Sequence, residues 1–263
     1  MTTLTTPTDH GYRQVERLMS VLAGDEKHSA AATSTLDVLW VLYDRVLDVD
    51  PADPDDPQRD RFYLSKGHGP MAYYAVLAAK GFFDETLLAG WGSFDSPLGF
   101  HPDRMLLPGV EISSGSLGHG LPLAVGTALG LRAQRNPARV FVLVGDAELD
   151  EGSNQEAREM AAALGLDNLT VVVVLVGDAE LDEGSNHEAL ELAAALDLAG
   201  LTVVVIDNHS SSYAVRGRIE RRFRTEGWHA VTVDGRDHDA LEAALSYRDA
   251  TRPTAVVAVI EEK

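Results

Sequence analysis

The second half of the chain alternates runs of apolar, mostly β-branched residues with segments of helical spacing. Between residues 139 and 262 the apolar runs are "RVFVLVGD", "LTVVVVLVGD", "LTVVVIDN", "HAVTVDG" and "TAVVAVIEE". Helices are expected between them, from about Asn154 to Leu164, Asn186 to Leu196 and Ala240 to Leu245. Continuous apolar strands separated by helices are typical of a parallel sheet that is covered on both faces. The pattern predicts an α/β protein with a doubly wound, mainly parallel sheet.

The first half shows mostly helical spacing with one irregular segment. Ser34, with Asp37 three residues later, resembles a capping box and predicts the start of a helix over Leu36–Leu47. Residues 49–60 are rich in Pro and Asp and predict an exposed loop. The other expected elements are a helix over Tyr12–Leu22, a strand at "RFYLS", a helix from near Pro70, and a glycine-rich loop that opens onto a helix within Ser113–Gln134.

Composition narrows the class of protein. A chain of 263 residues suits one large domain over residues 1–263. The formal charge of −19 argues against nucleic acid or an anionic membrane as a partner. The chain has no cysteine, no signal-peptide pattern at its start and no apolar run near the roughly 20 residues that span a bilayer. These features predict a cytoplasmic protein.

A long tandem repeat lies inside the strand-rich half. Residues 142–173 and 174–205 are identical at 26 of 32 positions, and the opening "VLVGDAELDEGSN" is unchanged between them. Each copy corresponds to one strand, loop and helix. Two copies are too few for a solenoid. We interpret the repeat as a duplicated unit, and a duplication without a function of its own remains equally open.

Polar residues that follow the apolar runs could bind a metal ion. Gly177-Asp178 and Asp207-Asn208 each end a run, and parallel strands present such ends at one edge of the sheet. Carboxylate and amide oxygens are ligands that suit Mg²⁺, which takes its remaining ligands from water and a diphosphate. Simple strand-ending turns would explain the same residues equally well. Three histidines beside glycine, proline or small residues, His28, His68 and His101, could bind substrate hydroxyls and move protons.

Four segments, in order, closely resemble the diphosphate-binding, N-terminal half of transketolase. They are "DRFYLSKGHGPMAYYAVLAAKGFF", "LGFHPDRMLLPGVEISSGSLGHGLPLAVGTALG", "GDAELDEGSNHEA" and "EGWHAVTVDGRDHDALEAAL". The resemblance runs from about Tyr12 to Val259. It implies the thiamine diphosphate-binding fold (PP domain), with thiamine diphosphate and Mg²⁺ (or Ca²⁺) as cofactors. It also implies transfer of a two-carbon ketol unit from a ketose phosphate to an aldose phosphate.

The resemblance assigns the metal site to the second copy of the repeat. The family's motif is Gly-Asp-Gly with an Asn some thirty positions later and a backbone carbonyl two positions beyond. Asp178 and Asn208 are 30 positions apart, and Ser210 would supply the carbonyl. The thirtieth position after Asp146 is Val176, so the first copy fits only the upstream part of the family pattern. A shifted site built from the two repeated aspartates is the alternative.

The remaining site residues also follow from the resemblance. Gly115 and Leu117 would approach the thiazolium and diphosphate, and His68 would lie near the diphosphate. His28 and His101 would face the substrate. In the second copy, Gly177 would contact the cofactor and Glu183, the twin of Glu151, would lie in a carboxylate network at a subunit interface. Both copies depart from the family in having Gly-Asp-Ala, and "EKHSAAATS" around His28 lacks the usual proline and glycines.

The resemblance covers only the diphosphate-binding half of the family, so a partner is expected. We expect a separate chain with the pyrimidine-binding and C-terminal domains, a heterotetramer of two copies of each chain, and no activity without the partner. The alternatives are a subunit that is degenerate and non-catalytic, and another thiamine diphosphate enzyme, similar to 1-deoxyxylulose-5-phosphate synthase or a dehydrogenase subunit. A Rossmann dinucleotide site is excluded because no G-x-G-x-x-G follows a strand with an acidic residue about 20 positions on.

The position of the extra strand and helix is a further expectation. A strand inserted in the middle of a parallel sheet would displace every later strand by roughly 4.8 Å. We therefore expect the repeated unit at an edge of the sheet or looped out of it.

Overall fold

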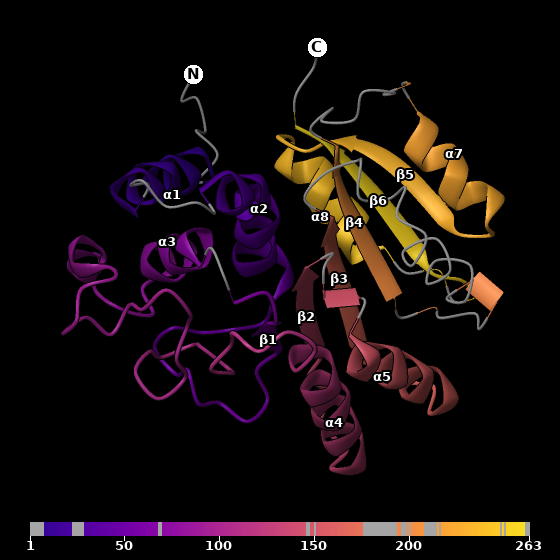
Figure 1. The fold of residues 1–263 in the computed structure, drawn as a ribbon, viewed down its shortest axis with the longest axis horizontal. Coiled ribbons are helices and arrows are strands. Elements are labelled where there is room, and N and C mark those ends of the chain that lie inside the picture. The colour runs from indigo at the N-terminus through magenta and orange to yellow at the C-terminus, as the bar shows by residue number, and fades with distance from the viewer. Residues whose placement is uncertain are drawn as a thin grey trace, which may run out of the picture.

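A six-stranded sheet forms the centre of the protein, and all of its strands are parallel (Figure 1). This computed structural model describes residues 8–22, 29–67, 70–145, 148–149, 151–175, 194–195, 199, 201–207, 215, 217–247, 249 and 251–260. The strand order is β1-β2-β3-β4-β6-β5, which confirms the predicted fold class. The strands are β1 (Arg61–Leu64), β2 (Val140–Gly145), β3 (Leu169–Leu175), β4 (Leu201–Asp207), β5 (His229–Asp234) and β6 (Thr254–Val259).

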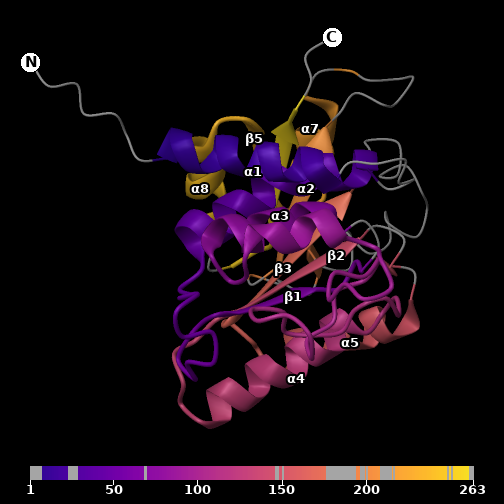
Figure 2. The same cartoon turned by 90° about the vertical axis from the view of Figure 1, so that its left-hand side faces the viewer.

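Helices cover both faces of this sheet (Figures 1 and 2). One face packs against α1 (Thr8–Leu22), α2 (Ser29–Val41), α3 (Met71–Lys80) and α8 (His238–Ser246). The other face packs against α4 (Gly120–Ala133), α5 (Gly152–Ala163) and α7 (Arg218–Thr225). A π-helical turn, η1 (Leu42–Val46), extends α2, and a 3₁₀ turn, η2 (Glu85–Gly90), follows α3. No helix in the described ranges is long and apolar enough to cross a membrane.

Alternate residues of each strand enter the two layers. In β2, Phe141 and Leu143 join the core beneath α1, α2, α3 and α8. Val140, Val142 and Val144 join the core beneath α4, α5 and α7. All of β2 is buried, because a strand with helices on both sides exposes neither set of side chains. The continuous apolar runs in the sequence have this physical origin.

The repeated unit lies in the middle of the sheet, so the expectation of an edge or looped-out position was wrong. Strands β2, β3 and β4 all carry residues of the two copies and are consecutive neighbours, while the edges are β1 and β5. The border between the copies falls inside β3, whose ladders run from Leu169 to Val174 against β2 and from Val171 to Leu175 against β4. The extra strand is therefore hydrogen-bonded on both sides, which an edge position would not provide.

Helix α2 begins earlier than the capping pattern suggested. It starts at Ser29, so Ser34 and Asp37 lie in its interior. Asp37 is instead a buried pairing residue: its carboxylate accepts from Arg236 Nη1 at 2.7 Å and lies 3.0 Å from His238 Nε2. Its side chain is only 3% exposed. Burial and the adjacent Asp37 carboxylate together raise the pKa of Tyr12.

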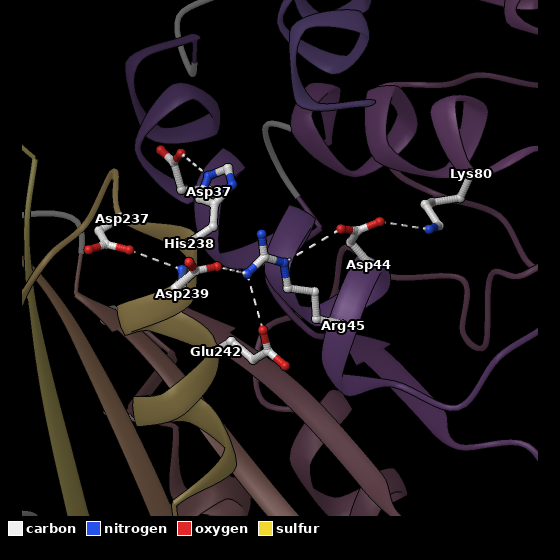
Figure 3. A network of polar contacts seen from close by, with 8 residues as sticks. All are labelled: Asp37, Asp44, Arg45, Lys80, Asp237, His238, Asp239 and Glu242. Atoms are coloured by element: carbon white, nitrogen blue, oxygen red, sulfur yellow. Dashed lines mark hydrogen bonds and ion pairs between the residues drawn. The ribbon is translucent and has the colours of Figure 1, made fainter. Parts of the chain in front are cut away.

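A polar network continues from this contact and ties η1 to the start of α8 (Figure 3). Arg45 Nη1 donates to Asp239 at 2.6 Å and to Glu242 at 3.1 Å. Asp44 lies 3.7 Å from the Arg45 Nε and accepts from Lys80 of α3 at 3.0 Å. Three helical segments that are distant in sequence are thus joined on one face of the sheet.

Candidate functional site

The carboxyl ends of β1 and β2 meet the glycine-rich loop that leads into α4. Ser65 and Lys66 directly follow β1 and are buried. The Ser65 amide donates to Leu143 at 2.9 Å, which extends the ladder past the last residue of β1. The Ser65 hydroxyl accepts from the amide of Gly120, the first residue of α4, at 3.1 Å. This contact fixes the amino end of α4 at the edge of the sheet where ligands bind in open α/β proteins.

A buried carboxylate joins these segments. Glu148 is fully buried, and its Oε1 accepts from Ser65 Oγ at 2.7 Å and from the Gly118 amide at 3.2 Å. Its Oε2 accepts from the Gly145 amide at 2.9 Å, at the last residue of β2. The site thus contains a polar group that the sequence analysis missed. The available signal was an acidic residue three positions after the end of a buried strand, inside the repeated "GDAELDEG".

Gly115 of the loop and Gly67 after β1 have neighbours too close to leave room for a side chain. Gly115 has φ +135°, and a Cβ at this position would lie 3.0 Å from His101 Cδ2. A Cβ at Gly67 would lie 2.6 Å from the Gly115 amide nitrogen. A side chain at either position would therefore displace the loop. The structure places His101 and Gly115, two of the predicted site residues, beside each other.

The segment that carries His101 is fastened to the same loop. The Ser114 amide donates to the Pro102 carbonyl at 3.1 Å, and Ser113 Oγ donates to Asp103 Oδ1 at 2.9 Å. His101 itself is exposed, and Leu117 is 37% exposed. An imidazole and an exposed backbone loop before a helix amino terminus form a surface that suits an anionic group. The described residues therefore fit the diphosphate end of the predicted cofactor.

The first copy of the repeat contacts this loop directly. Ser153 Oγ donates to the Gly118 carbonyl at 2.7 Å. Gly118 has φ +79°, and a Cβ there would lie 2.8 Å from the Glu151 Cβ. These contacts agree with the expectation that the first copy fits the upstream part of the family pattern.

The other predicted site residues lie outside the described residues, so their positions stay predictions. This group comprises His28, His68, Gly177, Asp178, Glu183, Asn208 and Ser210, together with Asp146 of the first copy.

The ladder between β3 and β4 bears on the metal assignment. Val171 pairs with Leu201 and Leu175 pairs with Val205, so paired residues are 30 positions apart. Asp178 and Asn208 have the same separation in the sequence. Between β2 and β3 the offset is 29, as in the pair of Gly145 with Val174. The offset of the β3–β4 ladder therefore equals the sequence separation of the two predicted ligands, which themselves lie outside the described residues.

Comparison with known proteins identifies the family. The model described as "Transketolase, thiamine diphosphate binding domain" matches residues 15–174 and 170–260, two stretches that overlap within β3. The chain is 49% identical over 255 residues to "Ferredoxin fas2" of Rhodococcoides fascians, and the match covers 97% of this chain and 73% of that protein. It is 45% identical over 145 residues to an apulose-4-phosphate transketolase subunit of Actinobacillus succinogenes, covering 55% of this chain and 52% of the relative.

Solved structures show the same fold. A crystal structure of a transketolase mutant from Pichia stipitis superposes with a TM-score of 0.58 over 95% of this chain, at 22% identity. The chain spans 35% of the length of that transketolase. With the family match over most of the chain, these findings confirm the resemblance seen in the sequence. The protein belongs to the transketolase family and contains its thiamine diphosphate-binding domain.

Proposed function

We propose that this chain is the thiamine diphosphate-binding subunit of a split transketolase. With a partner chain that carries the pyrimidine-binding and C-terminal domains, it would transfer a two-carbon ketol unit from a ketose phosphate to an aldose phosphate. The observation that supports this most directly is the proximity of His101 to Gly115 at the carboxyl edge of the sheet. The relative named as one subunit of a transketolase supports a two-chain assembly, which we propose is a heterotetramer.

Each site residue has a distinct proposed task. The exposed His101 imidazole would meet substrate and move a proton, and His28 would share this task. The backbone of Gly115, the Leu117 side chain and His68 would hold the diphosphate end of the cofactor. When bound, thiamine diphosphate supplies the nucleophilic carbon of ketol transfer.

The metal ion is assigned to the second copy of the repeat. Mg²⁺ (or Ca²⁺) would be held by Asp178, Asn208 and the Ser210 carbonyl beside Gly177, and Glu183 would lie at the subunit interface. The register of β3 and β4 supports this choice, because its offset equals the spacing of Asp178 and Asn208. A metal here would offset the charge of a diphosphate in a protein with a formal charge of −19.

A non-catalytic subunit is the second candidate, and the position of β3 favours it. In the proposed site the glycine loop touches β1 and β2, whereas the metal residues follow β3 and β4. The ends of β2 and β4 are separated by two strand spacings, about 10 Å. A cofactor held at both ends would have to span this extra strand. A chain that cannot do so would keep only the fold and its contacts with a partner.

Cofactor binding separates the two candidates. Titration calorimetry would follow thiamine diphosphate and Mg²⁺ binding to the complex with the pyrimidine-binding chain, and a coupled assay would follow conversion of a ketose phosphate and an aldose phosphate. Saturable, metal-dependent binding with turnover supports the enzyme. Absence of binding at millimolar cofactor supports the non-catalytic subunit.

Two aspartate variants test the metal assignment. We expect Asp178→Ala to abolish metal-dependent binding and Asp146→Ala to leave it within about threefold. A severe loss from Asp146→Ala alone would assign the metal to the first copy. A severe loss from both would favour a site shared between the two repeated aspartates.

A further inference from the structure

The Glu148 carboxylate is fully buried and accepts hydrogen bonds from three separate segments. The donors are Ser65 Oγ at 2.7 Å, the Gly118 amide at 3.2 Å and the Gly145 amide at 2.9 Å. They belong to the residue after β1, the glycine loop and the last residue of β2. One side chain therefore sets the positions of three backbone segments that line the cofactor end of the site.

The Glu148 backbone is itself held by the first turn of α5. Its carbonyl accepts from Asn154 Nδ2 at 2.6 Å and from the Glu151 amide at 3.0 Å. Asn154 is also fully buried. The backbone of Glu148 is thus held by α5, independently of the glycine loop. The hydrogen bond from the Gly118 amide to the Glu148 carboxylate then fixes the loop relative to α5.

Gly118 is held on both sides by residues of the first copy. Its amide donates to Glu148, and its carbonyl accepts from Ser153 Oγ at 2.7 Å. Gly118 directly follows Leu117 and lies three residues after Gly115, the two loop residues assigned to the cofactor. A shift of Gly118 would move both of them.

The side chain at this position has to accept hydrogen bonds and must not donate one, because all three of its neighbours are donors. An ionised carboxylate only accepts hydrogen bonds, and it can accommodate all three donors. Bonds from backbone amides to a charged acceptor are stronger than those to a neutral one. A glutamine of the same shape would direct an NH₂ group at one of the donors and leave a buried amide without an acceptor.

We propose that Glu148 is a positioning residue, through which the first copy of the repeat anchors the cofactor-binding loop while the second copy serves the metal. The two copies of one motif thus divide tasks that a single copy would otherwise combine. The structural part of this proposal stands on the described contacts, and its effect on cofactor affinity rests on the proposed function.

The matched variants Glu148→Gln and Glu180→Gln make the same change at equivalent positions of the two copies. Amide hydrogen exchange of the chain should show at least about tenfold faster exchange at Gly118 or at Gly145 in Glu148→Gln, because the single carboxamide oxygen can accept from only one of these two buried amides. Glu180→Gln should leave the exchange of Gly118 unchanged. Should Glu148→Gln fail to fold, Ser65→Ala removes one of the three donors and should accelerate exchange at Gly118 and Gly120 in the same direction.

Cofactor titration of the complex supplies the second measurement. For Glu148→Gln we expect the apparent thiamine diphosphate affinity to fall about tenfold or more, with kcat at saturating cofactor within about twofold of the parent. Unchanged exchange at both Gly118 and Gly145, or equal effects from Glu180→Gln, would overturn the proposal. Faster exchange in a complex whose parent binds no cofactor would instead overturn the proposed function and leave the anchoring role of Glu148 in place.

Discussion

A single methyl group at Gly118 should measure how tightly the glycine loop is packed against the first copy of the repeat. Gly118 has φ +79°, and a Cβ there would lie 2.5 Å from Ser153 Oγ and 2.8 Å from the Glu151 Cβ. The Gly118→Ala variant therefore combines a strained backbone conformation with a steric overlap against α5. These two effects can be separated because the chain offers glycines that have only one of them, or neither.

The magnitudes follow from the surroundings of each glycine. Left-handed backbone costs alanine about 1–2 kcal/mol, and overpacking a tight contact costs about 1–3 kcal/mol more. Gly118→Ala should thus lower the free energy of unfolding by about 2–5 kcal/mol. Gly81 has φ +86° with no atom within 4 Å of an added Cβ, so Gly81→Ala should cost only the backbone term of about 1–2 kcal/mol. Gly126 lies within α4 in open space, and Gly126→Ala should stabilise by about 0.5–1 kcal/mol.

Urea unfolding of the three variants, followed by circular dichroism, gives the comparison. The difference between Gly118→Ala and Gly81→Ala isolates the contact with α5. Losses that agree within about 0.5 kcal/mol, the usual margin for comparing independent sites, would refute the inference that the loop and the first copy are in tight contact. Destabilisation by Gly126→Ala would show that α4 has a neighbour at this position that the structure lacks.

Two further predictions concern carboxylates outside the site. Asp60 is buried and accepts from the amides of Asp48 at 3.0 Å and Arg139 at 2.7 Å, so Asp60→Ala should cost about 2–4 kcal/mol of unfolding free energy, measured by urea titration. A loss below about 1 kcal/mol would contradict the role of Asp60 as a buried acceptor. Asp239 pairs with Arg45, but the side chain of Asp239 is 90% exposed. Asp239→Ala should therefore change the free energy of unfolding by no more than about 0.5 kcal/mol in the same titration. A larger loss would mean that solvent does not screen the pair.

The fold could be predicted from the sequence because its signals are local. All six strands were expected from short runs of apolar residues. In β2, β4 and β6 these runs are continuous because both faces of the strand are buried. Helix α7 was missed because only Ile219 and Phe223 of its eight residues are buried, and charged residues dominate the rest. Asp37 was misread as part of a helix cap because its partner Arg236 is 199 positions away, which no local pattern reveals.

The candidate site was predictable only in part. Family motifs singled out His101 and Gly115, and the structure places them beside each other, while their roles toward substrate and cofactor stay predictions. Glu148 was missed because its role depends on donors from Ser65 and Gly118, which come together only once the sheet has formed. The repeated unit lies in the middle of the sheet instead of at the predicted edge, because β3 gains hydrogen bonds to a neighbouring strand on both sides.

The border between the two copies lies inside β3, so one strand and one helix could be removed from the chain as a unit. Both copies open with the same "VLVGDAELDEGSN". Removing residues 142–173 would therefore join Phe141 to Val174 and keep the sequence that follows Phe141 in the present chain. Such an excision would fuse the start of β2 to the unit that ends in β4 and return a five-stranded sheet in which the fused strand and β4 are neighbours, without β3 between them. The protein thus contains, in its own sequence, the shorter form against which the effect of its extra strand can be judged.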